Sequence, residues 1–199
     1  IFSTVTHEII EGSQPDLKVL KVSIEEKATG EIMAGAGVGT DGTAFMFALT
    51  ENNWLGRGIK VKGGADISKS KISGNLSIVN PNYNYTGNAV YSSLNISSTD
   101  AKDTSGYESS KTGFSLGTKF EQYENVYLSP SIDFSYEDIS ADSTATATVK
   151  KMEGSFTNVD FGYGISLDKR NQSFQPTDGY KAAFLQTLPL LQDSSSILT

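Results

Sequence analysis

The sequence predicts an all-β protein whose strands are arranged as in an antiparallel transmembrane β-barrel. From Gly30 onward, one segment after another alternates apolar and polar residues with a period of two, which is the pattern of strands that have one apolar face. These predicted strands run to about 9–14 residues, longer than most globular strands and suited to a tilted membrane crossing. No comparable stretch has the apolar spacing of an amphipathic helix.

The first 27 residues have a different pattern from the rest of the chain. The segments Phe2 to Ile10 and Leu17 to Glu26 are predicted strands, and the residues between them, Gly12 to Asp16, are typical of a loop. We expect this part to be the last two strands of a small α+β domain that begins upstream.

Along the larger part, the alternation assigns two faces to the predicted sheet. One face is apolar and is expected to contact lipid: Ile59, Val61, Ile72, Leu76, Leu94, Leu128 and Ile132. The other face is polar and is expected to line a lumen: Lys60, Lys62, Asn75 and Asp133. Aromatic residues near predicted strand ends are candidates for the girdles at the membrane interfaces: Trp54, Tyr83, Tyr85 and Tyr107.

The connections between the predicted strands differ in length. Residues 99–108 and 138–154 are long and polar, whereas the connections at residues 53–58, 80–88 and 123–125 are compact. Long loops at one end and short turns at the other are typical of an outer-membrane barrel. Two alternatives share the alternating pattern, namely a soluble all-β surface or adhesion protein and a transport pore with a polar channel.

Charge and composition exclude several classes of function. The 199 residues carry 16 basic and 23 acidic side chains, and the net charge of −7 repels nucleic acid. There is no cysteine, and His7 is the single histidine, so thiolate sites, histidine metal clusters and a Ser-His-Asp triad are not expected. No apolar run is long enough for a transmembrane helix, which a membrane β-barrel does not need.

Three short motifs suggest chemistry but lie in the wrong context. Residues 113–117 match the G-x-S-x-G pattern of a nucleophile elbow, yet they lie inside an alternating segment and no histidine follows them. Residues 35–39 are similar to a dinucleotide-binding loop, but a tight turn follows where that loop needs a helix. The acidic residues in the segment 137–142 lack the spacing of a calcium loop. We therefore expect no enzyme activity, no cofactor and no metal site.

Four segments contain specific residues that a β-barrel does not require for its strand pattern. The first runs from Glu26 to Gly30 and continues through a glycine-rich strand to Gly42, and the others are turns. The distinctive turn residues are Asn53, Trp54, Leu55, Gly56, Gly58, Asn80, Pro81, Asp168, Arg170, Phe174, Pro176 and Gly179. In this order, the segments resemble those of the BamA family of outer-membrane β-barrel assembly factors. The turn at Asn80 departs from the family pattern because its aromatic pair is displaced.

This resemblance implies a fold and a location. The fold is the N-terminal part of a sixteen-stranded antiparallel transmembrane β-barrel, preceded by the last strands of an α+β POTRA domain. Residues 1–27 correspond to the C-terminal POTRA strands, and residues 28–199 to the first nine or so barrel strands, an incomplete barrel. The location is the outer membrane of a Gram-negative bacterium, with the POTRA end in the periplasm. Residues 99–108 and 138–154 are then expected outside the cell, and Trp54 and residues 174–179 at the periplasmic rim.

The resemblance also implies a function, which is the folding and insertion of other β-barrel proteins. The expected partners are unfolded outer-membrane proteins as clients, outer-membrane lipids and the lipoproteins of the assembly machinery. Client strands are expected to pair with the edge of the first barrel strand, at Gly30, Ile32, Ala34, Gly35, Gly37 and Gly39. Its glycines weaken pairing at that edge, which can then offer backbone groups to an incoming strand. The alternative is a TamA-like or other translocation barrel or pore of the same superfamily.

Overall fold

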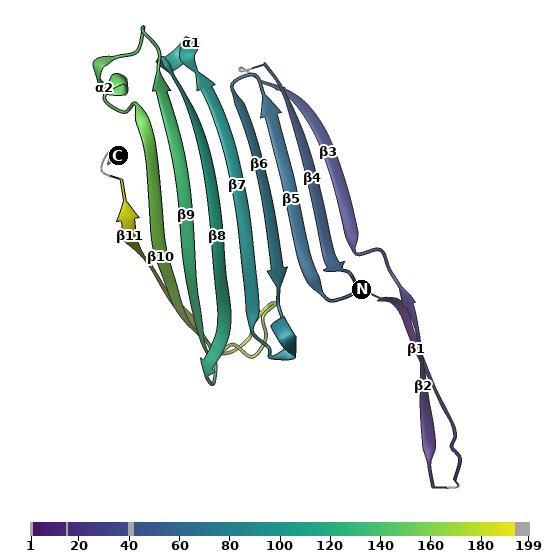
Figure 1. Ribbon diagram of the computed structural model, residues 1–199. Helices are drawn as coiled ribbons and strands as arrows, with labels where there is room; N and C mark the ends of the chain where they lie inside the picture. The colour runs from purple at the N-terminus through teal and green to yellow at the C-terminus, as the bar shows by residue number, and fades with distance from the viewer. Residues whose placement is uncertain (1, 15, 40–41, 194–199) are drawn as a thin grey trace.

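The computed structural model describes residues 2–14, 16–39 and 42–193, which form two antiparallel sheets (Figure 1). The smaller sheet pairs β1 (Phe2–Glu11) with β2 (Lys18–Glu26). The larger sheet has nine strands in chain order: β3 (Gly30–Gly39), β4 (Gly42–Trp54), β5 (Ile59–Ser68), β6 (Lys71–Asn80), β7 (Ala89–Ala101), β8 (Tyr107–Tyr123), β9 (Val126–Ala141), β10 (Gly154–Asp168) and β11 (Lys181–Gln192). Short helices lie in the connections: η1 (Tyr83–Tyr85), α1 (Lys102–Ser105) and α2 (Ala147–Lys150).

The β1–β2 hairpin confirms the two strands expected near the N-terminus. Its register places Val5 opposite Ile24 and Ile9 opposite Leu20, so these apolar residues share one face of the hairpin. In Figure 1 the hairpin projects away from the larger sheet near the start of β3. The assignment of these strands to a POTRA domain stays a prediction.

The nine-stranded sheet confirms the fold class and the number of barrel-like strands. Each strand pairs with its neighbour in sequence, and within the described part of the chain β3 and β11 form the two edges. The register is continuous over long stretches, for example from Lys71 opposite Thr99 to Asn80 opposite Val90. A continuous register keeps the two-residue alternation in phase from strand to strand.

Apolar residues of successive strands lie opposite one another on one face of this sheet. Leu76 lies opposite Leu94, Leu94 opposite Phe114, and Phe114 opposite Phe134. Cross-strand partners share a face, and so do alternate residues within a strand. All seven residues expected to contact lipid therefore lie on this apolar face, and the four expected to line a lumen lie on the opposite, polar face.

Nothing in the described part of the chain covers the apolar face. Leu116 is 50% exposed and Ile132 is 52% exposed, although both lie in the middle of the sheet. Ala145, in a connection, is the single buried apolar residue among those described. A soluble β-sandwich covers such a face with a second sheet, whereas a membrane β-barrel exposes it to lipid.

The connections differ from expectation in two respects. Residues 99–108 do not form a long loop, because β7 continues to Ala101 and β8 begins at Tyr107. The prediction that long connections gather at one end is also wrong, since residues 142–153 and residues 169–180 leave the sheet at opposite ends (Figure 1). The β7–β8 ladder extends through polar residues because backbone groups alone make its hydrogen bonds. These residues have no apolar alternation that would predict a strand.

The aromatic residues at the strand ends also divide between the two faces. Tyr107 lies on the polar face with Ser109 and Lys111, so its expected place in an outer girdle is wrong. Trp54 lies opposite Ile59, on the apolar face. A bulge between Glu51 and Trp54 shifts the alternation by one residue, which brings the tryptophan to this face.

Among residues 2–14, 16–39 and 42–193, no helix combines the length and the apolar character that spanning a membrane requires.

Candidate functional site

Strand β3, which the sequence predicts as the place of strand addition, is an edge strand in the structure. It pairs with β4 from Gly30 opposite Glu51 to Gly39 opposite Gly42, and in the described part of the chain no strand lies on its other side. In an antiparallel pair, half of the backbone groups of a strand point away from the partner. Among the described residues, the outward N–H and C=O groups of β3 thus have no strand partner, as in edge strands.

The six predicted edge residues all lie on β3 and divide between its faces. The polar face has Gly35, Gly37 and Gly39, and the apolar face has Gly30, Ile32 and Ala34. A Cβ atom at Gly37 would meet no heavy atom within 4 Å, and one at Gly35 would meet only Met46 Cε, at 3.7 Å. Ile32 is 80% exposed. The backbone ladder to β4 thus holds this part of β3 with little help from side chains.

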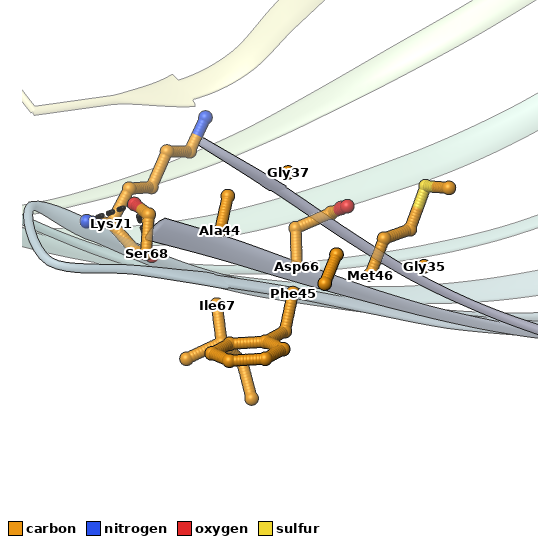
Figure 2. A pocket seen from close by; sticks show the side chains of 10 residues that line it. Gly35, Gly37, Ala44, Phe45, Met46, Asp66, Ile67, Ser68 and Lys71 are labelled. Atoms are coloured by element: carbon orange, nitrogen blue, oxygen red, sulfur yellow. Dashed lines mark hydrogen bonds between the residues drawn. The ribbon is translucent and has the colours of Figure 1, made fainter. Parts of the chain in front are cut away.

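A hollow of about 440 Å³ lies on the sheet beside this edge. Figure 2 shows its lining, in which Asp66 and Lys71 rise on the polar face next to the bare backbone at Gly37. Phe45 and Ile67 point to the opposite side of the sheet (Figure 2). The polar face beside β3 therefore has space for side chains of a strand added to the edge.

The turns singled out in the sequence lie at one end of the sheet, the end at which β3 begins (Figure 1). β4, β6 and β10 all end there, and this end is called the junction rim below. The matched residues on the junction rim are Asn53, Trp54, Leu55, Gly56, Gly58, Asn80, Pro81, Asp168, Arg170, Phe174, Pro176 and Gly179. They shape separate turns and do not form one cluster.

In the first of these turns, at residues 53–58, hydrogen bonds and backbone angles account for several of the residue types. Asn53 Oδ1 accepts a hydrogen bond from the Gly58 N–H at 2.7 Å, and the Gly56 N–H donates to the Asn53 carbonyl at 3.0 Å. Gly56 and Gly58 have φ values of 69° and 67°, which glycine adopts without strain, whereas Leu55 has a φ of 56°, which is uncommon for a residue with a side chain. The next turn also uses asparagine side chains, because Asn80 Oδ1 accepts from the Asn82 N–H at 3.1 Å and Asn82 Oδ1 accepts from the Gly87 N–H at 2.7 Å.

The connection at residues 169–180 is held by side chains at both ends. Arg170 Nε and Nη2 each donate to an oxygen of Asp168 at 2.7 Å, and this carboxylate raises the pKa of Arg170. Asn171 Oδ1 accepts from the Thr177 N–H at 3.2 Å. A Cβ at Gly179 would lie 2.0 Å from the Lys169 carbonyl, and its φ is 89°, so only glycine fits there.

Thr29, before β3, contacts Glu51 and Asn52 of β4, and the sequence does not predict these contacts. Thr29 Oγ1 donates to Glu51 Oε1 at 2.5 Å. The backbone N–H and the Nδ2 group of Asn52 both donate to the Thr29 carbonyl, at 3.2 and 3.1 Å. No local pattern predicts these contacts, because they join segments that only the sheet brings together.

The opposite end of the sheet has its own ordered connection. The Asp142 N–H donates to the Gly106 carbonyl at 2.7 Å, and Ala145 packs over Gly106. Hydrogen bonds from Thr144 and Ser143 lower the pKa of Asp142. In the part of the chain that the structure describes, no group of His, Cys, Asp or Glu side chains is placed to hold a metal ion.

Comparisons with known proteins agree with this geometry. Residues 53–198 match the profile of the Omp85 superfamily domain. The fold is similar to the crystal structure of BamA from Haemophilus ducreyi lacking POTRA domains 1–3, with a TM-score of 0.67 and 20% sequence identity. The similarity covers 95% of this chain and 39% of that chain. This chain therefore spans less than half the length of that protein.

Proposed function

The chain belongs to the Omp85 superfamily, whose members are outer-membrane insertion or translocation barrels, and from that premise we propose that it folds and inserts other β-barrel proteins. The observation that supports this proposal is the edge strand β3, whose outer backbone groups have no partner in the described part of the chain. Backbone pairing suits clients of many sequences, since every residue except proline offers one donor and one acceptor.

The composition of β3 suits a strand that exchanges partners. Each glycine in a strand costs about 0.5–1 kcal/mol relative to alanine, because glycine loses more conformational freedom on folding. Gly35, Gly37 and Gly39 also leave the second half of the polar face of β3 without side chains. Pairing at this edge is therefore weak enough to open, and a client strand can add to it.

The proposal extends to organisation and partners. We assign residues 1–27 to the last strands of a POTRA domain and residues 28–199 to the first strands of the barrel. Unfolded outer-membrane proteins are the clients, outer-membrane lipids cover the apolar face, and assembly lipoproteins are further partners. The junction rim faces the periplasm, because β3 leaves the POTRA strands there.

Cross-linking tests the edge. Cysteines that replace Ile32 or Ala34 in the full-length protein are expected to cross-link to the terminal strand of a client during assembly. Ile132→Cys is the matched control, because Ile132 lies on the same face in the middle of the sheet. Heat-modifiable gel mobility checks that each variant has folded. A folded barrel that cross-links clients at Ile132 but never at β3 would overturn the edge mechanism.

Labelling tests the orientation. Ser105 and Ser143 lie in connections at one end of the sheet, and Ser173 lies at the junction rim. Cysteines at Ser105 and Ser143 are expected to react with an impermeant reagent in intact cells, whereas one at Ser173 is protected. The reverse pattern would invert the topology. A steady single-channel conductance without client insertion would favour the transport pore.

A further inference from the structure

The link between the β1–β2 hairpin and the edge strand is tied to β4 by hydrogen bonds. β2 ends at Glu26 and β3 begins at Gly30, so residues 27–29 form the whole link. Its last residue, Thr29, donates its hydroxyl to Glu51 Oε1 at 2.5 Å. The Thr29 carbonyl accepts from the Asn52 backbone at 3.2 Å and from Asn52 Nδ2 at 3.1 Å. Both the side chain and the backbone carbonyl of Thr29 thus hold the link to β4.

The Glu51 carboxylate is itself held in place. Oε1 also accepts from the Asn53 N–H at 2.7 Å, so the carboxylate bridges the link and the first turn of the junction rim. A Cβ at Gly30 would lie 2.7 Å from Glu51 Oε2, and glycine at this position leaves room for the carboxylate. The bulge after Glu51 takes Asn52 and Asn53 out of the regular ladder with β5, and the bond from the Asn52 N–H to the Thr29 carbonyl continues the β3–β4 register by one residue.

We propose that Thr29, Glu51 and Asn52 form a latch that fixes the first residues of β3 to β4 and transmits the position of the hairpin to the edge strand. This inference rests on the proposed function and concerns how strand addition at β3 is regulated. The latch uses groups of β4 and leaves the outer edge of β3 free, so it does not compete with an added strand. A charge-assisted hydrogen bond such as that from Thr29 to Glu51 is stronger than a neutral one.

The two ends of β3 therefore differ in how firmly they are held. The Gly30 end has the latch, whereas at the Gly39 end a Cβ at Gly37 or Gly39 would meet nothing within 4 Å. Local opening starts where side-chain contacts are fewest. The latch thus keeps the Gly30 end of β3, the open end of the β3–β4 hairpin, aligned as the place where a client strand starts to pair. Thr29 and Glu51 are positioning residues in this scheme.

Hydrogen exchange in the full-length protein tests the latch without any client. Thr29→Val keeps the shape of the side chain and removes the donor, and we expect amide exchange in residues 27–34 to rise by about tenfold. Exchange in residues 35–39 should change much less. Thr118→Val is the matched control, because the Thr118 hydroxyl donates to the Ala89 carbonyl at 2.8 Å between β8 and β7. Thr29→Ser should restore the parent exchange. Unchanged exchange in residues 27–34 of folded Thr29→Val would overturn the latch.

Cross-linking then tests what the latch does for clients. In a protein with cysteine at Ile32, Thr29→Val should lower the client cross-link several-fold with the barrel still folded, and Thr118→Val should not. An undiminished cross-link would show that the latch does not guide strand addition. If the parent protein itself gives no cross-link at β3, the proposed function fails, and the exchange experiment still decides whether the latch holds the edge strand.

Discussion

Strands β3 and β8 both place glycines on the polar face of the sheet, but the surroundings of these glycines differ. A Cβ at Gly117 of β8 would lie 2.3 Å from Tyr91 Cζ, because the ring of this cross-strand partner covers the glycine. A Cβ at Gly37 of β3 would meet nothing within 4 Å. β8 has a strand on each side, whereas in the described part of the chain β3 has one only.

Gly64 and Gly164, on other strands, are covered by a neighbouring side chain as Gly117 of β8 is. A Cβ at Gly164 would lie 2.7 Å from Leu185 Cδ2, and one at Gly64 would lie 2.6 Å from Asn75 Oδ1. In each case the missing side chain makes space for that of a neighbouring strand. The comparison teaches that Gly64, Gly117 and Gly164 make room for side chains of neighbouring strands, whereas Gly37 and Gly39 of β3 make room for none and leave that part of the edge weakly held.

The largest expected effect is the difference in stability between a charge placed in the middle of the sheet and the same charge placed at its edge strand. Leu116→Arg places a charge on the apolar face near the middle of β8, which costs roughly 2–4 kcal/mol at the bilayer midplane. Val38→Arg places the same charge on the apolar face near the end of β3, where the cost falls to about 0–1 kcal/mol. Denaturant unfolding of the full-length barrel in lipid vesicles measures both. Equal losses would contradict the assignment of Leu116 to the membrane interior.

A smaller effect on stability is expected from replacing the covered glycine, Gly117, compared with the uncovered one, Gly37. Gly117→Val forces the Tyr91 ring to move and should lower the free energy of unfolding by about 1–3 kcal/mol, the usual cost of overpacking. A Cβ at position 37 meets no atom within 4 Å, so Gly37→Val should cost less than Gly117→Val. The same unfolding measurement compares the two variants.

A double mutant separates this packing effect from the general cost of a bulky residue in the strand. Tyr91→Ala removes the ring, so adding Gly117→Val to it should cost less than adding it to the parent protein. If the two changes are simply additive, the Tyr91 ring does not determine the need for glycine at position 117.

The smallest expected effect concerns stiffness at the edge. Gly37→Ala lowers the conformational freedom of the unfolded chain and should stabilise β3 by about 0.4–1 kcal/mol, since the added methyl group has open space. Amide exchange in residues 35–39 should slow, and client cross-linking at β3 should fall because the edge opens less often. Faster cross-linking in this variant would contradict a role for strand weakness.

Much of the fold follows from local sequence pattern alone. A two-residue alternation depends only on neighbouring residues, so the strands from Ile59 to Leu167, their two faces and the nine-stranded sheet could all be predicted. The strand from Gly30 to Gly39 could also be predicted, because it follows directly after a change in pattern at the end of the N-terminal segment, and its role in strand addition stays a prediction. Turn residues such as Asn53 and Gly58 act within a few positions of one another and are likewise visible.

Tertiary structure alone decided the features that depend on cross-strand register. Alternation says which face a residue is on, but not which residue lies opposite, so Tyr91 over Gly117 and Thr29 beside Glu51 could not be foreseen. The polar ends of β7 and β8 were predicted as a loop, because backbone pairing needs no apolar signature. A bulge brought Trp54 to the apolar face, and an unbroken register kept Tyr107 on the polar one. The sequence thus determined the strands and their faces, and the pairing of strands determined which side chains meet, because such contacts join residues far apart in the chain.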